Sequence, residues 1–157
     1  MVRRNKKAPA ATGSIVSAGP AFPKVTRRNK RATAYDHLQL GLIFYRSKSY
    51  DLAIEQFQLA CKQAPHAVNV WNNLAVAYMD KGELDKAMSA LQHALKLNPR
   101  YASAHFHLGQ LHDKLGNNEL ARDCYLKVIE FDKHGELGRR AKERVEGFHP
   151  RVIFSLH

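Results

Sequence analysis

The first chemistry that the residues of this sequence suggest is metal binding, because the chain contains nine histidines. His105, His107 and His112 fall within one short stretch, and imidazole is a common zinc ligand. If that stretch is a helix, His105 and His112 lie on one face and His107 lies on another. No carboxylate or thiol at ligand spacing completes the set. We therefore predict that the chain binds no metal ion.

The other reactive side chains do not form a recognisable catalytic arrangement. The sequence holds no phosphate-binding loop, dinucleotide fingerprint or nucleophile elbow. Asp80, Glu83 and Asp85 surround an expected turn and helix start, where carboxylates interact favourably with the helix dipole. Cys61 and Cys124 belong to no C-x-x-C pair and are expected to be buried free thiols. We predict a protein that is not an enzyme and uses no cofactor.

Positive charge is concentrated at the beginning of the chain. The formal net charge is +11, but nine of the 25 basic residues lie in residues 1–33, which contain no acidic residue. The remainder holds 16 basic and 14 acidic residues and is nearly neutral. The nine residues are Arg3, Arg4, Lys6, Lys7, Lys24, Arg27, Arg28, Lys30 and Arg31. This high like-sign charge, without helical periodicity, predicts a disordered basic arm over residues 1–33.

The arm contains one basic tetrapeptide twice, at residues 3–6 and 27–30. Two such clusters are compatible with contacts to nucleic-acid phosphates, a membrane surface or an acidic protein. They are equally compatible with a nuclear address in a eukaryote, or with an arm that only solubilises the chain. The sequence does not separate these alternatives.

We expect neither a membrane-spanning helix nor a cleaved signal. Residues 8–22 are weakly apolar after a basic start, but Gly13, Gly19, Pro20 and Pro23 interrupt them. No stretch approaches the eighteen apolar residues that a membrane-spanning helix needs. With only two unpaired cysteines, the composition predicts a cytoplasmic protein, or a nuclear one in a eukaryote.

A period of 34 residues organises the rest of the chain and would have to position any functional side chain. It divides the sequence into blocks 34–67, 68–101 and 102–135 without insertions. Four positions recur in all three blocks: Leu40, Leu74 and Leu108; Ala53, Ala87 and Ala121; Phe57, Leu91 and Tyr125; Ala60, Ala94 and Val128. The middle block has two apolar stripes at helical spacing, separated at Gly82 and ended at Pro99. Each block is therefore expected to form two antiparallel helices.

The blocks resemble tetratricopeptide repeats. In the middle block the resemblance rests on Trp71, Leu74, Ala75, Tyr78, Gly82, Ala87, Ala94 and Pro99. In the first block it rests on Leu40, Gly41, Phe44, Ala53, Phe57, Ala60 and Pro65, with His37 in place of tryptophan. In the third block it rests on Leu108, Gly109, Gly116, Ala121 and Tyr125, with His105 and His112 in aromatic positions. The resemblance implies an all-α fold: a right-handed superhelical stack of antiparallel helix pairs, or alpha-alpha solenoid, whose concave face is lined by the first helix of each pair.

Residues 136–148 are expected to form a helix that caps the stack. Leu137, Ala141, Val145 and Phe148 fall on one face of that helix and can cover the last apolar surface. The tail, residues 149–157, contains the short apolar run 152–154, which either folds back on the stack or contacts a partner.

The resemblance also indicates which residues face a concave groove. Those we assign to it are Leu38, Gln39, Leu42, Tyr45, Asn69, Asn72, Asn73, Val76, Phe106, His107 and Gln110. The amides of Asn72, Asn73 and Gln110 can bind a peptide backbone, and the apolar members can receive anchor side chains. Alternatively, Leu38 and Phe106 only pack against neighbouring repeats. The favoured function is a scaffold or adaptor that binds a peptide or helix of a partner protein. The alternative is a nucleic-acid- or ribonucleoprotein-associated protein anchored by its basic arm.

One known use of such domains is not expected in this chain. The groove differs from a dicarboxylate clamp, the Lys, Arg and Asn set that binds the acidic C-terminal tails of heat-shock chaperones. Asn73 matches one clamp asparagine, but Leu42 occupies the position of the other. Ser103 and His107 stand where the clamp has Lys and Arg. A dicarboxylate would therefore lose its hydration without gaining enough opposite charge.

Overall fold

The computed structural model describes residues 32–147, which are folded into α-helices with no β-strand in that range. In chain order the helices are α1 (Ala34–Arg46), α2 (Tyr50–Gln63), α3 (Val68–Lys81), α4 (Leu84–Leu97), α5 (Ala102–Lys114), α6 (Asn118–Phe131) and α7 (Glu136–Gly147). The basic arm, Phe148 and the apolar run 152–154 lie outside the described residues. None of these seven helices is long and apolar enough to span a lipid bilayer.

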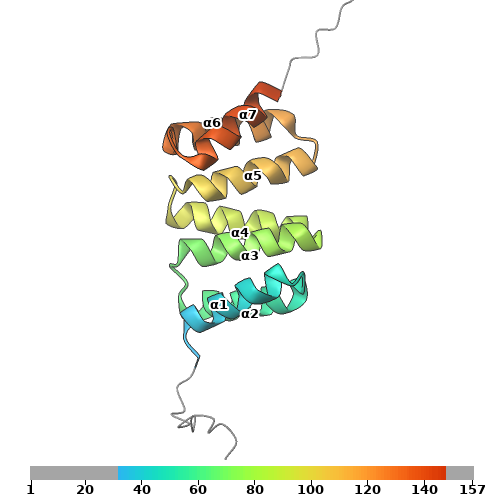
Figure 1. The fold of residues 1–157 in the computed structure, drawn as a ribbon, viewed down its shortest axis with the longest axis vertical. Coiled ribbons are helices and arrows are strands. Elements are labelled where there is room, and N and C mark those ends of the chain that lie inside the picture. Colours follow the sequence, from blue (N-terminus) through green and yellow to red (C-terminus); the bar gives the residue numbers. More distant parts are fainter. Residues whose placement is uncertain (1–31, 148–157) are drawn as a thin grey trace, which may run out of the picture. The chain divides into compact units, whose positions relative to one another are not determined.

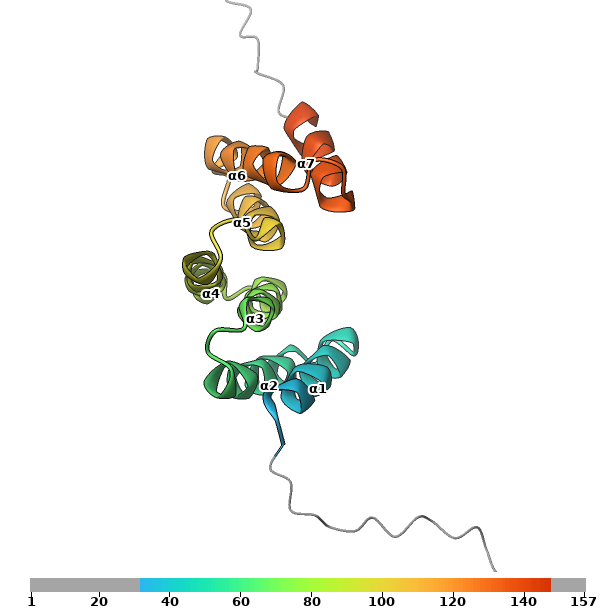
Figure 2. The same ribbon diagram turned by 90° about the vertical axis from the view of Figure 1, so that its left-hand side faces the viewer.

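The helices stack in sequence order as antiparallel pairs, which confirms the all-α repeat fold. Helix α1 packs on α2, α3 on α4 and α5 on α6, and α7 packs on α6 (Figure 1). Figure 2 shows two layers, with α1, α3, α5 and α7 in one and α2, α4 and α6 in the other. The first helices of the three repeats therefore share one face of the stack.

Local sequence signals set the helix ends. The side chain of Thr33 accepts a hydrogen bond from the backbone N–H of Asp36, and the carboxylate of Asp36 accepts one from the backbone N–H of Thr33. This reciprocal capping box fixes the start of α1. Helix α3 is capped at its C-terminus by Gly82, whose φ of 89° lies in the left-handed region that glycine adopts at little cost. The equivalent turn of the first repeat places Lys48 in the same region.

Within each repeat a small residue of the first helix faces a large residue of the second. A Cβ atom on Gly41 would lie 2.5 Å from Cε1 of Phe57, and one on Gly109 would lie 2.7 Å from Cε1 of Tyr125. The middle repeat has Ala75 and Leu91 at these positions, and both are fully buried. The absence of a side chain at Gly41 and Gly109 thus allows a larger ring in the second helix.

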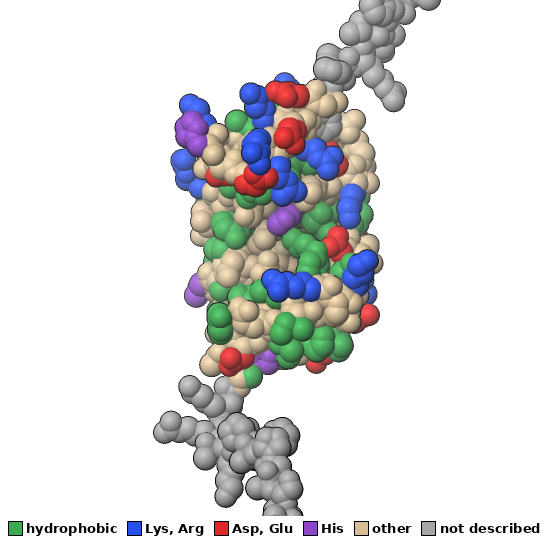
Figure 3. Space-filling view, in the orientation of Figure 1, with side chains coloured by type: hydrophobic (Ala, Val, Ile, Leu, Met, Phe, Trp, Pro, Cys, Tyr) green, Lys and Arg blue, Asp and Glu red, His purple; other side chains and the backbone are tan. Residues whose placement is uncertain are grey.

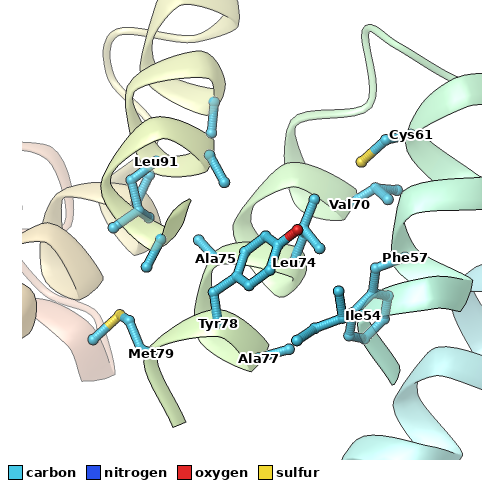
Figure 4. Close-up of a cluster of buried hydrophobic side chains, with 14 of the residues drawn as sticks. Ile54, Phe57, Cys61, Val70, Leu74, Ala75, Ala77, Tyr78, Met79 and Leu91 are labelled. Atoms are coloured by element: carbon cyan, nitrogen blue, oxygen red, sulfur yellow. The ribbon is translucent and has the colours of Figure 1, made fainter. Parts of the chain in front are cut away.

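The buried residues form two clusters. The larger cluster spans the first two repeats, where Ile54 and Phe57 of α2 face Leu74 and Ala77 of α3 (Figure 4), and it extends to α5. The smaller cluster lies among the last three helices and contains Phe106, Ala121, Tyr125, Val128 and Ala141. Leu137 and Val145 of α7 pack against it, so α7 covers the apolar surface of the third repeat.

Both cysteines are buried free thiols, as expected from the sequence. Burial raises the pKa of the Cys61 thiol to about 12 and also raises the pKa of Cys124. Neither thiol is therefore ionised to an appreciable extent at neutral pH, and neither has the thiolate character of a reactive cysteine.

Candidate peptide-binding groove

The layer of first helices contains a hollow of about 520 Å³. Its lining comes from α1, α3, α5 and α7 and consists of Tyr45, Val76, Met79, Asp80, His107, Gln110, Asp113, Lys114 and Arg144. On the face shown in Figure 3, hydrophobic side chains gather towards α1 and α3, whereas charged side chains gather at the end formed by α6 and α7. The lining of the hollow itself combines apolar side chains with two carboxylates and two basic side chains.

Hydrogen bonds hold the acidic side chains of this groove in place. The hydroxyl of Tyr45 donates to the carboxylate of Asp80 and so connects α1 to α3. The hydroxyl of Tyr125 donates to Asp113 at 2.6 Å, and a guanidinium nitrogen of Arg144 lies 3.9 Å from the same carboxylate. Each of these carboxylates thus accepts a hydrogen bond from a tyrosine of another helix, which restricts its position before any ligand binds.

A buried amide–imidazole pair joins α3 to α5 at the edge of the hollow. Nδ1 of His107 lies 2.9 Å from Oδ1 of Asn72, whose side chain is buried. Because an amide oxygen only accepts, Nδ1 of His107 carries the proton and donates it. Burial lowers the pKa of His107 to about 4, and the charge of Arg140 acts in the same direction. The imidazole is therefore neutral at physiological pH.

Four of the residues predicted from the sequence line the hollow together: Tyr45, Val76, His107 and Gln110. Gln39 and Asn69 are exposed on the same helices, and Asn73 is half-buried. Leu38 and Leu42 are half-buried and pack against the larger core.

Two predicted groove residues have a different environment and require correction. Phe106 is only 2% exposed, with its ring 5.6 Å from that of Tyr125 and the guanidinium of Arg140 4.7 Å from its centre. Asn72 is 5% exposed and is hydrogen-bonded to His107. Both occupy the same position of the 34-residue period. In the second and third repeats this position packs inside the stack, so these side chains are not available to a ligand.

The expected placement of His105 at an aromatic position of the repeat is supported by its hydrogen bond. Nε1 of Trp71 donates to the backbone oxygen of Pro65 at 2.8 Å, and Nε2 of His105 lies 2.9 Å from the oxygen of Pro99 one repeat later. His105 thus replaces both the ring and the hydrogen bond of the tryptophan. In residues 32–147 no three His, Cys, Asp or Glu side chains come together in a way that could hold a metal ion.

A second hollow, of about 840 Å³, lies on α2, α3 and α4. Its lining includes Cys61, Trp71, Leu74, Tyr78 and His93, and the rings of Trp71 and His93 are 4.0 Å apart. This surface was not predicted from the sequence. Its lining comes mainly from the second helices, so it is a separate surface from the groove.

The sequence matches the models of a known protein family. A model described as TPR repeat matches residues 41–82 and 75–116, and one described as tetratricopeptide repeat matches residues 102–134. Together with the stacked helix pairs, these matches show that the chain belongs to the tetratricopeptide repeat family. This is a family of protein-interaction repeats.

Among curated proteins, the chain is 29% identical over 110 residues to the uncharacterized protein ycf37 of Guillardia theta. That match covers 67% of this chain and 62% of the relative. This chain is also 28% identical over 123 residues to the tetratricopeptide repeat domain-containing protein PYG7, chloroplastic, of Arabidopsis thaliana. That second match covers 76% of this chain and 41% of the relative. The chain thus spans less than two thirds of either relative. Because one relative is chloroplastic, a cytoplasmic location stays a prediction.

Solved structures agree on the fold. The first TPR domain of Spaghetti (RPAP3), bound to the HSP90 peptide SRMEEVD, has a TM-score of 0.66 and 22% identity, covering 73% of this chain and 91% of that one. The type III secretion translocator chaperone SycD of Yersinia enterocolitica has a TM-score of 0.71 and 18% identity, covering 76% of this chain and 94% of that one. At these identities the likeness concerns the fold alone.

Proposed function

We propose that the chain is a non-catalytic scaffold or adaptor that holds a peptide or helix of a partner protein in the groove on α1, α3 and α5. The observation that carries this proposal is the hollow of about 520 Å³, to which the first helix of every repeat contributes. A surface built from all three repeats presents a continuous path for an extended ligand.

The lining of the hollow favours a ligand that combines apolar anchors with backbone hydrogen bonds. Val76, which is half-buried, provides apolar surface, whereas Met79 lines the hollow but is only 5% exposed. The amide of Gln110 can donate to and accept from a peptide backbone. Asp80 is already oriented by Tyr45, so less side-chain entropy is lost on binding.

The same lining argues against the acidic tail that the Spaghetti domain binds. His107 occupies a clamp position but is neutral at physiological pH because of its depressed pKa, and Asp80 and Asp113 offset the positive charges of Lys114 and Arg144 in the hollow. We expect no saturable binding of a fluorescent SRMEEVD peptide to the full chain by anisotropy. The first TPR domain of Spaghetti (RPAP3) serves as the positive control. Saturable binding that unlabelled peptide displaces would show that the groove is a clamp after all.

The groove is tested by placing a long charged side chain in it. Val76→Arg should weaken capture of partner proteins by the full chain at least about tenfold, because it fills the hollow and places a charge beside Met79. Ser89→Arg, on the other hollow, makes the same charge change and should leave capture unaffected. The measurement is quantitative mass spectrometry of proteins retained from an extract, with circular dichroism as a check that both variants fold.

A parallel capture after nuclease treatment separates the groove from the basic arm. Partners that bind the groove survive nuclease and are lost with Val76→Arg. If the retained proteins disappear with nuclease and are indifferent to Val76→Arg, the groove is not the principal binding site and the proposal fails.

A further inference from the structure

Helix α1 exposes the face that its counterparts use to pack on the preceding repeat. In α3 that face consists of Val70, Leu74 and Ala77, all of which are buried in the larger core. One period earlier, the same positions of α1 hold Asp36, Leu40 and Ile43. Two of the three positions have therefore kept large apolar side chains although no helix of the described residues covers them.

The exposure of these side chains is high. Leu40 is 39% exposed and Ile43 is 59% exposed, and Tyr35, on the groove side of the same helix, is 67% exposed. A single exposed leucine needs no explanation, but apolar residues at successive stacking positions of one helix form a surface that fits another helix. We call Leu40 and Ile43 the α1 surface.

The other end of the stack is chemically different. Helix α7 buries Ala141, whereas Arg139, Lys142 and Glu146 are exposed on it. A charged α7 does not offer an apolar face to the α1 surface, which disfavours head-to-tail association of copies.

We propose that the α1 surface is a homodimer interface, in which α1 of one copy packs antiparallel on α1 of a second copy. A two-fold axis passing between residues 41 and 42 brings Leu40 of each copy against Ile43 of the other. The acidic residue of the helix, Asp36, lies in its first turn, while Arg46 lies in its last turn and Lys48 follows it. Antiparallel pairing therefore places opposite charges, and opposite ends of the helix dipoles, beside each other.

The interface is small, since it is built around a single helix of 13 residues. Such a contact belongs to the class below about 1,200 Å² of total buried area, which supports weak and reversible association. The dimer should accordingly be visible as a mass that rises with protein concentration. It leaves the groove lining free, because Tyr45, which lines the hollow from α1, faces α3 through its hydrogen bond to Asp80.

Sedimentation equilibrium of the full chain over about a hundredfold range of concentration tests this proposal. The wild-type mass should rise towards that of a dimer, and Ile43→Glu should raise the dissociation constant at least about tenfold. Leu120→Glu is the matched control, because Leu120 is 51% exposed on α6 and the equivalent residue of the second repeat is the charged Lys86.

The result that supports the interface is loss of association in Ile43→Glu with retention in Leu120→Glu. A wild-type chain that stays monomeric over the whole range overturns the proposal, as does a dimer that Ile43→Glu leaves intact. Far-ultraviolet circular dichroism on the same samples ensures that the comparison is made between folded proteins.

Discussion

Replacing Gly41 by alanine should lower the free energy of unfolding by roughly 1–3 kcal/mol. The added Cβ would lie 2.5 Å from the ring of Phe57, which is buried and cannot move away into solvent. This steric cost opposes the gain of about 1 kcal/mol that alanine normally brings over glycine within a helix. Urea unfolding followed by circular dichroism measures the net change. Gly147→Ala is the control, because a Cβ there would meet no atom within 4 Å.

The middle repeat suggests how the steric cost can be relieved. Its fully buried Ala75 and Leu91 occupy the positions of Gly41 and Phe57. In a double-mutant cycle, Gly41→Ala combined with Phe57→Leu should therefore be more stable than the sum of the single changes predicts, by about 1 kcal/mol or more. Strictly additive effects would show that the glycine and the ring are not coupled through packing.

Acidification from about pH 7.5 to about pH 4.5 should reduce stability by about 2–3 kcal/mol through His107 alone. Its pKa falls from 6.5 to about 4 on folding because the imidazole is buried beside Arg140. In this pH range the unfolded chain binds the proton more readily than the folded chain. The stabilisation that comes from keeping His107 neutral is therefore fully present above its unfolded pKa of 6.5 and is lost as the pH decreases towards 4.

The variant His107→Gln isolates this contribution, because glutamine does not titrate and keeps an N–H group for the oxygen of Asn72. Unfolding free energies measured at several pH values should fall less steeply for this variant than for the wild type. His66→Gln, at an exposed position, makes the same substitution outside the core and serves as the control. Equal slopes for His107→Gln and the wild type would mean that His107 is accessible to protons in the folded chain.

Most of the fold could be predicted because the same pattern of apolar and small residues recurs in every repeat. Three copies of the positions occupied by Phe57, Leu91 and Tyr125 define the period, and the period implies the helix pairs. Single substitutions did not obscure the pattern. His105 was predicted to take the place of an aromatic ring. In the structure its ring bonds to the backbone oxygen of Pro99, which is the period equivalent of Pro65, the acceptor of Trp71.

The groove was harder to predict, because the exposure of a side chain in it depends on how each repeat is rotated against the next. Asn72 and Phe106 share one position of the period, and in both cases the adjacent helices cover it. Met79 and Asp113 were missed, although they are the period equivalents of Tyr45, which was assigned to the groove. Applying the period to every assigned residue would have found both. Arg144 carries no such signal, since α7 lies outside the repeats.

The division of the interior into two clusters has a consequence for how the chain acquires its structure. The larger cluster is built from the first two repeats and the near face of α5, so most of its residues are present once residues up to about Leu111 are available. The smaller cluster needs α7 and its Ala141 to be complete. Because the contacts connect helices that are close in sequence, little loop-closure entropy opposes them. The amino-terminal repeats can thus fold while the chain is still being synthesised, and the last repeat follows when α7 docks.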